Sequence, residues 1–161
     1  AFYKEDFFKI NGFEPVKDRV SGDDMYLVQS ISKLKKGYIN IDPNSFVKTI
    51  AMPTMKEFIN QRVRWSSNSK LNATENPLFF SFLSTMFIYN NIIIISFLLG
   101  GNWFFLFLFK FILEGSVIFL GGKLFNRKIE LLPFCLWSIA QPIYIPLVGI
   151  LGLKEKFIWK P

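Results

Sequence analysis

Two groups of side chains in this sequence have types and spacing that could support chemistry. The first is the acidic pair Asp23 and Asp24, which follows Gly22 where a helix is expected to begin. A carboxylate in this place could act as a general base if an acceptor hydroxyl came within hydrogen-bond distance. Acids are also favoured at helix N-termini by the helix dipole and by capping. The spacing alone therefore leaves both interpretations of the pair open.

The second group is the run Gln61-Arg62-Val63-Arg64-Trp65. Because a helix turns about 100° per residue, Gln61, Arg64 and Trp65 share one flank. A forked guanidinium can hold a diphosphate through two hydrogen bonds, and an indole face offers a sugar ring an apolar platform. The same side chains also suit an interfacial helix whose Trp lies at headgroup depth and whose arginines meet lipid phosphate. Arg62 falls among the apolar positions, where it is expected to snorkel.

The composition of the 161-residue chain is that of a membrane protein. Half of the residues (51%) are hydrophobic and 20 are Phe, which is too apolar for an ordinary soluble domain. The net charge of +7 is spread without a dense basic block, which favours membrane lipids and phosphorylated ligands as partners and predicts no nucleic acid. With no histidine and with Cys135 as the single cysteine, the sequence excludes a zinc site, a His-based triad and a disulfide within the chain.

The segments around the two groups predict the elements that position them. Ser21 and Asp24 have the spacing of a capping box, and lysines followed by Gly37 close the helix that begins there. Residues 38–41 and 45–50 alternate as two short strands, which gives residues 1–53 an α/β pattern. A second capping-box spacing, between Thr54 and Glu57, opens the amphipathic helix that carries the Gln61 to Trp65 run, so residues 54–77 are expected to form an interfacial helix and linker.

Residues 78–161 are predicted to form a transmembrane region of two to three helices. Residues 78–101 carry no charge and are long enough, at about 1.5 Å per residue, to cross a hydrocarbon layer of about 30 Å. Residues 102–122 must return as a helical hairpin, and they contain Lys110 and Glu114 one helical turn apart. An unpaired charge at mid-bilayer costs about 2.5–3.5 kcal/mol, so we expect these two side chains to pair and to face another helix.

The third apolar run, residues 131–153, is interrupted by prolines. It could bend as a re-entrant segment near Gln141-Pro142 or cross the membrane fully, and its length favours a full crossing. Basic residues flank this run on both sides, whereas the tip at 100–102 has no charge, so the positive-inside rule puts the tip outside and both flanks in the cytoplasm. A single crossing would put the two flanks on opposite sides of the membrane, so it cannot place both in the cytoplasm. The side on which the C-terminus lies is therefore left open.

Taken together, the motifs resemble those of a known enzyme family. The order and spacing of four runs match the C-terminal part of a membrane-bound family 2 glycosyltransferase, the group of cellulose, hyaluronan and poly-N-acetylglucosamine synthases: Ala1–Phe7, Asn11–Glu14, Ser21–Leu27 and Gln61–Trp65. The resemblance covers residues 1–65. The apolar runs from residue 78 onward match the family only in being predicted membrane spans. It implies the C-terminal portion of an α/β GT-A nucleotide-sugar fold that faces the cytoplasm, followed by α-helical transmembrane segments of the inner or plasma membrane.

The resemblance also implies roles for single residues. Asp24 takes the position of the catalytic base in an inverting transfer from a nucleoside-diphosphate sugar to a glycan or lipid-linked acceptor. Asp23 stands where the family more often has glutamate in its acidic substrate-binding motif. Gln61 and Arg64 would hold the donor diphosphate, and Trp65 would line the acceptor site, with Arg62 supporting the same helix.

Part of the family pattern is missing from this sequence. The nucleotide-binding strands and the Asp-any-Asp motif precede the matched region, so a divalent cation (Mg or Mn) is implied but its ligands are not in this chain, which itself is expected to hold no metal. We therefore expect the chain, which starts without an initiator Met, to be a piece of a longer enzyme that is inactive in isolation. The alternative is a noncatalytic membrane anchor or interaction module, with the acidic pair as a cap and residues 61–65 as an interfacial anchor.

Overall fold

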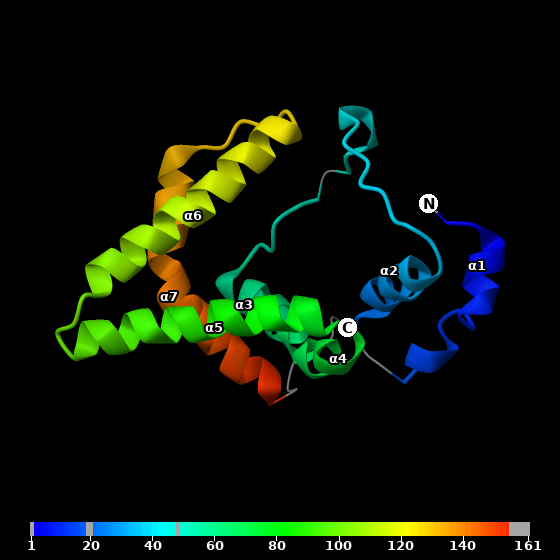
Figure 1. Cartoon of the computed structure of the whole chain (residues 1–161), viewed down its shortest axis with the longest axis horizontal. Coiled ribbons are helices and arrows are strands. Elements are labelled where there is room, and N and C mark those ends of the chain that lie inside the picture. Colours follow the sequence, from blue (N-terminus) through cyan, green and yellow to red (C-terminus); the bar gives the residue numbers. More distant parts are fainter. Residues whose placement is uncertain (1, 19–20, 48, 155–161) are drawn as a thin grey trace. The chain divides into compact units, whose positions relative to one another are not determined.

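The computed structural model describes residues 2–18, 21–47 and 49–154, and every regular element within those ranges is helical. The chain divides into two compact units: unit 1 consists of Ala1–Ile39, Met52–Ser81 and Leu151–Pro161, and unit 2 of Asn40–Ala51 and Phe82–Ile150. In chain order the elements are α1 (Lys4–Lys9), the 3-10 turn η1 (Glu14–Val16), α2 (Asp23–Leu34), the 3-10 turn η2 (Pro43–Ser45), α3 (Met55–Ser67), α4 (Ser69–Glu75), α5 (Pro77–Leu98), α6 (Trp103–Leu124) and α7 (Leu131–Leu153) (Figure 1).

The predicted α/β fold is wrong, because the described residues contain no β-strand and no sheet, and hence no α/β nucleotide-sugar fold. The predicted strands at 38–41 and 45–50 form no ladder where they are described, and Ser45 belongs to the 3-10 turn η2. A strand needs a neighbour for its backbone N–H and C=O groups, and an isolated hairpin is marginally stable in water. The alternating side chains also bury no face, since Tyr38, Val47 and Ile50 are 84%, 87% and 93% exposed.

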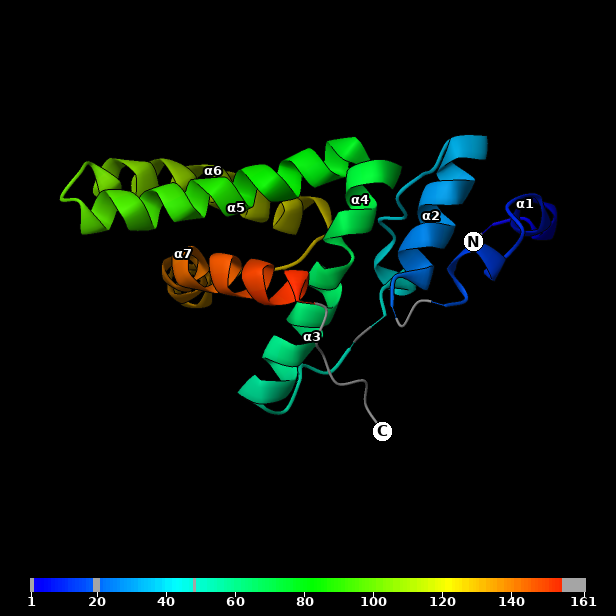
Figure 2. The same cartoon turned by 90° about the horizontal axis from the view of Figure 1, so that it is seen from below.

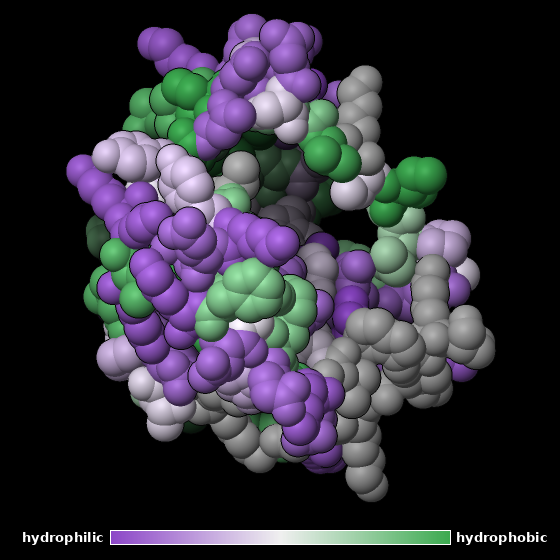
Figure 3. Space-filling model, turned by 90° about the vertical axis from the view of Figure 1, so that its right-hand side faces the viewer, coloured by the Kyte–Doolittle hydropathy of each residue, from purple (hydrophilic) through white to green (hydrophobic). Residues whose placement is uncertain are grey.

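Unit 1 brings α1, α2 and α4 together largely through polar contacts. The Tyr26 hydroxyl on α2 donates a hydrogen bond to the carbonyl of Ile10 at 3.0 Å, and Lys35 forms an ion pair of 2.7 Å with the buried carboxylate of Asp6. The surface over this part of the chain is mostly hydrophilic, with scattered apolar side chains (Figure 3). Such a surface suits contact with water rather than with lipid tails.

The two predicted capping boxes have different outcomes. At the start of α3 the N-cap half of the box is confirmed, because the Thr54 hydroxyl accepts the backbone N–H of Glu57 at 3.2 Å. The one at Ser21 and Asp24 is wrong: Gly22 is the N-cap of α2, with a φ of 95°, and no side chain caps this helix. Glycine takes this left-handed conformation without the strain that a Cβ would bring, so the chain turns into α2 through Gly22.

Unit 2 consists mainly of three long apolar helices. α5 and α6 form a hairpin, seen in Figures 1 and 2, which turns at Gly100 with a φ of 69° and is joined by a hydrogen bond of 3.0 Å from the Tyr89 hydroxyl to the Leu106 carbonyl. α7 packs on α6 through Phe134, whose ring centre lies 4.9 Å from that of Phe111. The predicted pairing inside the hairpin is confirmed, because the buried Lys110 ammonium lies 2.8 Å from the Glu114 carboxylate.

All three helices are long and apolar enough to cross a membrane, with 22, 22 and 23 residues. At about 1.5 Å per residue, each covers roughly the 30 Å of a hydrocarbon layer. The third run forms a continuous helix through Pro142 and Pro146, without the break that a re-entrant bend would need. The basic residues that follow Lys154 lie outside the described residues. The helices support membrane association and contact with lipid.

Candidate functional site

The acidic pair lies in the first turn of α2, and both of its side chains are exposed. One oxygen of Asp24, Oδ1, accepts the backbone N–H of Met25 at 2.8 Å. The other oxygen, Oδ2, has no hydrogen-bond partner within the part of the chain that the structure describes. An exposed carboxylate with one oxygen unoccupied is able to accept a proton from an approaching hydroxyl.

A cavity of about 340 Å³ adjoins Asp24. One wall comes from α2, with Met25, Val28 and Gln29. The other comes from Asn76, which joins α4 to α5, and from Phe79 in the first turn of α5. This lining combines apolar surface with two amide side chains, which is a suitable surface for a ligand that carries both hydroxyl groups and apolar faces.

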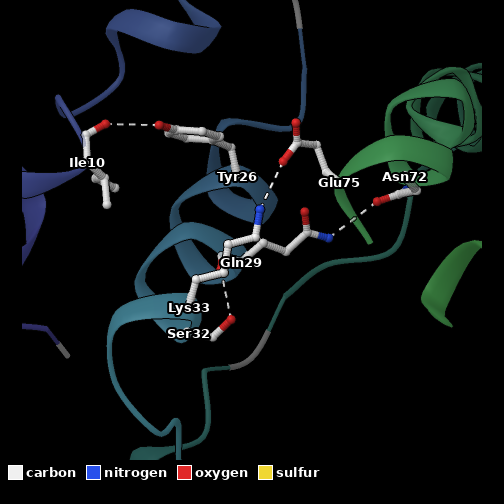
Figure 4. Close-up of polar contacts among 7 residues, drawn as sticks. All are labelled: Ile10, Tyr26, Gln29, Ser32, Lys33, Asn72 and Glu75. Carbon is white, nitrogen blue, oxygen red and sulfur yellow. Dashed lines mark hydrogen bonds and ion pairs between the residues drawn. The ribbon is translucent and has the colours of Figure 1, made fainter. Parts of the chain in front are cut away.

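Polar contacts fix α2 beside α4, as Figure 4 shows. The Gln29 amide donates to Asn72 Oδ1 at 3.3 Å, and Lys33 forms an ion pair of 3.0 Å with Glu75 (Figure 4). Asn72 is buried, whereas the ion pair is exposed and therefore contributes little to stability. These contacts set where the N-terminus of α2, and with it Asp24, lies relative to α4.

The N-terminus of α2 also meets the residue that follows α3. A Cβ added at Gly22 would lie 3.0 Å from Oδ1 of Asn68, so the glycine backbone packs directly against this amide. The Asn68 amide nitrogen lies 3.4 Å from the Ser21 hydroxyl. Because Asn68 comes three residues after Trp65, the start of α2 and the end of α3 adjoin each other at this amide.

Replacing Gly22 with alanine should destabilise unit 1. The new Cβ would press on Asn68 and hold a φ of 95° that alanine rarely adopts, which together should cost about 1–2 kcal/mol. The matched control is Gly37→Ala, because nothing lies within 4 Å of a Cβ at Gly37. Hydrogen exchange of the α2 amides would measure the effect, and equal protection in the two variants would contradict the assigned role of Gly22.

The Gln61 to Trp65 run lies on α3, as predicted, with Gln61 and Arg64 half-buried and Trp65 50% exposed. The structure differs from the expectation for Arg62, whose guanidinium does not simply extend to the surface. It lies 4.9 Å from the ring centre of Phe58 and 4.3 Å from that of Trp65. Arg62 therefore supports the Trp65 indole by a cation–π contact.

The far end of α3 is also held by α7. Gly152 approaches Ser66 so closely that a Cβ at Gly152 would overlap the serine side chain. The last two residues of α3 are Ser66 and Ser67, so α3 ends between this contact and the one that Asn68 makes with Gly22. Both contacts lie next to Trp65 and restrict the movement of its part of the helix.

The structure thus places the predicted residues on neighbouring elements of one unit. The side chains described around the Asp24 cavity do not include Gln61, Arg64 or Trp65, and the elements that carry the two groups adjoin at Asn68. Sequence reasoning missed Asn68 and the stacking of Arg62. The spacing of Phe58, Arg62 and Trp65 by four and three residues could have indicated the stacking, whereas nothing in the sequence pairs Asn68 with Gly22.

A divalent cation does not fit the residues that the structure describes. No group of three or more acidic, histidine or cysteine side chains among them could hold a metal ion, and the acidic pair at the start of α2 is only two residues long. Exposed neighbouring carboxylates with so few ligands bind Mg²⁺ weakly. We therefore derive no chemical step through a metal.

The arrangement can supply an exposed base, a half-buried amide and guanidinium, and an indole supported from beneath by Arg62. These groups suit the removal of a proton from a hydroxyl, contact with an anion and stacking on a sugar ring, respectively. No protein-family model, curated protein or solved structure gives a significant match to the chain.

Proposed function

We propose that this chain carries the base and the diphosphate- and acceptor-binding side chains of an inverting membrane glycosyltransferase that makes or modifies a cell-surface polysaccharide or glycolipid. The observation that supports it best is the junction at Asn68, where the start of the helix with Asp24 adjoins the end of the helix with Gln61, Arg64 and Trp65. The order of the four sequence motifs supports it independently.

In the proposed reaction the Asp24 carboxylate accepts the proton of an acceptor hydroxyl. The hydroxyl oxygen attacks the anomeric carbon of the donor sugar, and the bond between that carbon and the diphosphate oxygen breaks. The electron pair of this bond leaves with the nucleoside diphosphate. A single displacement of this kind inverts the anomeric configuration.

Arg64 and Gln61 act on the leaving group in this proposal. A guanidinium binds two phosphate oxygens at once, and its charge offsets the negative charge that develops as the diphosphate departs. Trp65 provides a platform for the acceptor sugar ring, and its half-exposed indole leaves a face available for stacking. The nucleoside of the donor would be bound outside the residues that the structure describes, on the cytoplasmic side of the membrane.

The direct test is sugar transfer by the full-length protein in membranes. Vesicles that contain it should transfer label from at least one of a panel of radiolabelled nucleoside-diphosphate sugars into a polymer or lipid fraction. The isolated 161-residue chain should transfer none. A panel that gives no transfer with the full-length protein would count against the proposal.

Replacing Trp65 with alanine should weaken acceptor use more than donor binding. Loss of the indole removes a stacking surface, which should raise the KM for the acceptor by about tenfold, the effect of about 1.4 kcal/mol. Binding of the donor, measured by titration calorimetry, should change by less than about twofold, because the guanidinium of Arg64 remains. Trp137→Ala, on α7, is the control for loss of an indole elsewhere. Equal losses for acceptor and donor would contradict the role of Trp65.

One observation favours a second candidate, a noncatalytic membrane anchor. The stack of Phe58, Arg62 and Trp65 combines a cation with two aromatic rings just before the first apolar helix. Such a cluster is typical of a helix at headgroup depth. An anchor would show no nucleotide-sugar-dependent transfer and no effect of replacing Asp24.

A further inference from the structure

A second cavity, separate from the candidate site, is a groove in unit 2. It has a volume of about 650 Å³ and is formed by the connection between α2 and α3 and by the residues that follow α6: Asn40, Ser45, Phe46, Val47, Phe125 and Arg127. None of these residues has a role in the proposed sugar transfer. We refer to this cavity as the basic groove.

The lining of the groove includes two aromatic rings and a cation. Phe46 and Phe125 pack edge to face with ring centres 5.9 Å apart, and the Arg127 guanidinium lies 5.1 Å from the ring centre of Phe46. Asn40 uses Oδ1 to accept the backbone N–H of Asp42, which directs its amide nitrogen to other partners. The groove therefore offers a guanidinium and an amide N–H to an anion, above an apolar floor.

The charge around the groove is positive on balance. Lys123, Arg127 and Lys128 are all exposed, and in the described parts of the chain they form no ion pair. Two acids are near in sequence: Glu130 just before the next helix, and Asp42 on the connection that lines the groove. Three basic side chains against two acids leave a net positive charge, which favours an anionic occupant.

The position of the groove along α6 identifies the kind of anion. Residues 115–122 of α6 carry no charge, and the helix ends at Leu124, so the groove lies where the apolar span gives way to basic residues. That boundary corresponds to the headgroup region of a bilayer. On the same connection Val47 and Ile50 are 87% and 93% exposed, and water is an unfavourable environment for both. An occupant with a phosphate and an acyl chain would satisfy the cation and the aliphatic side chains together.

We propose that the basic groove binds the phosphate of an anionic membrane phospholipid, with Arg127 as its principal ligand and the connection around Val47 and Ile50 in contact with the acyl region. The guanidinium, held over Phe46, forms the charge-assisted hydrogen bonds to phosphate, and Lys123 and Lys128 add attraction at longer range. This site is independent of the proposed sugar transfer.

The test uses the full chain in nanodiscs that contain phosphatidylcholine and phosphatidylglycerol. After transfer to detergent, native mass spectrometry should detect phosphatidylglycerol retained by the protein, and Arg127→Glu should lower that retention by at least about fivefold. Lys154→Glu is the matched control, since Lys154 is an exposed basic residue at the end of another span. It should retain the lipid like the unaltered chain, and equal loss in both variants, or no loss in either, would overturn the proposal.

Two further measurements separate lipid binding from misfolding and from the binding of free phosphate. Circular dichroism of Arg127→Glu should match that of the unaltered chain, and Phe46→Leu, which keeps every charge, should also weaken retention because the guanidinium loses its aromatic support. If Phe46→Leu retained the lipid fully, the groove would not be the site. Addition of millimolar inorganic phosphate should leave the lipid bound. Displacement by phosphate would identify a site for free anions and would overturn the lipid assignment.

Discussion

Replacing Asp24 with asparagine should lower the turnover number for sugar transfer by at least about 100-fold, because general-base catalysis typically contributes a factor of about 10² to 10⁴. Asparagine keeps the size of the side chain, and its carbonyl oxygen can still accept the Met25 N–H, but the amide does not take a proton from the acceptor. Donor binding should persist, since Asp24 has no role in holding the diphosphate. The measurement is release of nucleoside diphosphate by the full-length protein in nanodiscs, together with calorimetric binding of the donor.

The control is Asp18→Asn, which neutralises another exposed carboxylate of unit 1 that has no role in the proposed reaction. Its turnover should stay within about twofold of the unaltered enzyme, as is usual for surface substitutions. Normal turnover by Asp24→Asn would remove Asp24 from the role of base. Loss of both turnover and donor binding would indicate that Asp24 supports the fold or the donor site instead.

Replacing Lys110 with methionine should destabilise the helices of unit 2 by about 3 kcal/mol, the cost of breaking a buried ion pair by removing one partner. Lys110 is only 4% exposed, and its ammonium lies 2.8 Å from Glu114 Oε2 and 2.9 Å from Gln141 Oε1 on α7. Without the lysine, the Glu114 carboxyl group loses its partner in the apolar region and the Gln141 oxygen loses its donor. Unfolding of the protein in mixed micelles by sodium dodecyl sulfate, followed by circular dichroism, would measure the change.

Two variants separate the ion pair from general damage to α6. Leu113→Ala, at a site that is 51% exposed, should cost less than about 1 kcal/mol because it leaves no buried polar group unpaired. The double variant Lys110→Met, Glu114→Leu should recover most of the stability, since it removes both charges. A double variant as unstable as the single one would show that packing around Lys110, and not its charge, stabilises the helices.

The buried polar groups of unit 2 also explain how α7 packs on α6. Gln141 meets Lys110, and Ser138 lies three residues before Gln141 and so on the same flank of α7. Ser138 and Asn90 are both 0% exposed, although most side chains of these helices face outward. Polar side chains are costly against lipid and favour the interior of a helical bundle. Burial of these side chains favours the orientation of each helix about its own axis that turns them toward the neighbouring helices.

The sequence was a poor guide to residues 38–50. Their alternation of apolar and polar side chains predicted two strands, yet their described apolar side chains other than Phe46 are exposed and no ladder forms among the described residues. Alternation gives a strand two faces, but the strand forms only when another strand offers hydrogen-bond partners and a core covers one face. The same limit applied to the start of α2. The spacing of Ser21 and Asp24 predicted a capping box, but the helix begins at Gly22, whose backbone packs against Asn68.

The sequence by itself determined the features that depend on neighbouring residues and on the bilayer. Long apolar runs predicted two to three membrane helices, the Thr54 and Glu57 spacing predicted the start of α3, and the spacing of one helical turn predicted the ion pair of Lys110. Tertiary structure alone decided that Gln141 accepts from Lys110, that Asn68 joins α2 to α3, and which side chains line the cavity beside Asp24. The reason is physical. Helix formation and membrane burial are set by local free energies, whereas these contacts join residues that are 31 positions apart (Lys110 and Gln141) to 55 positions apart (Asp24 and Phe79). Whether such residues meet depends on the packing of the elements between them.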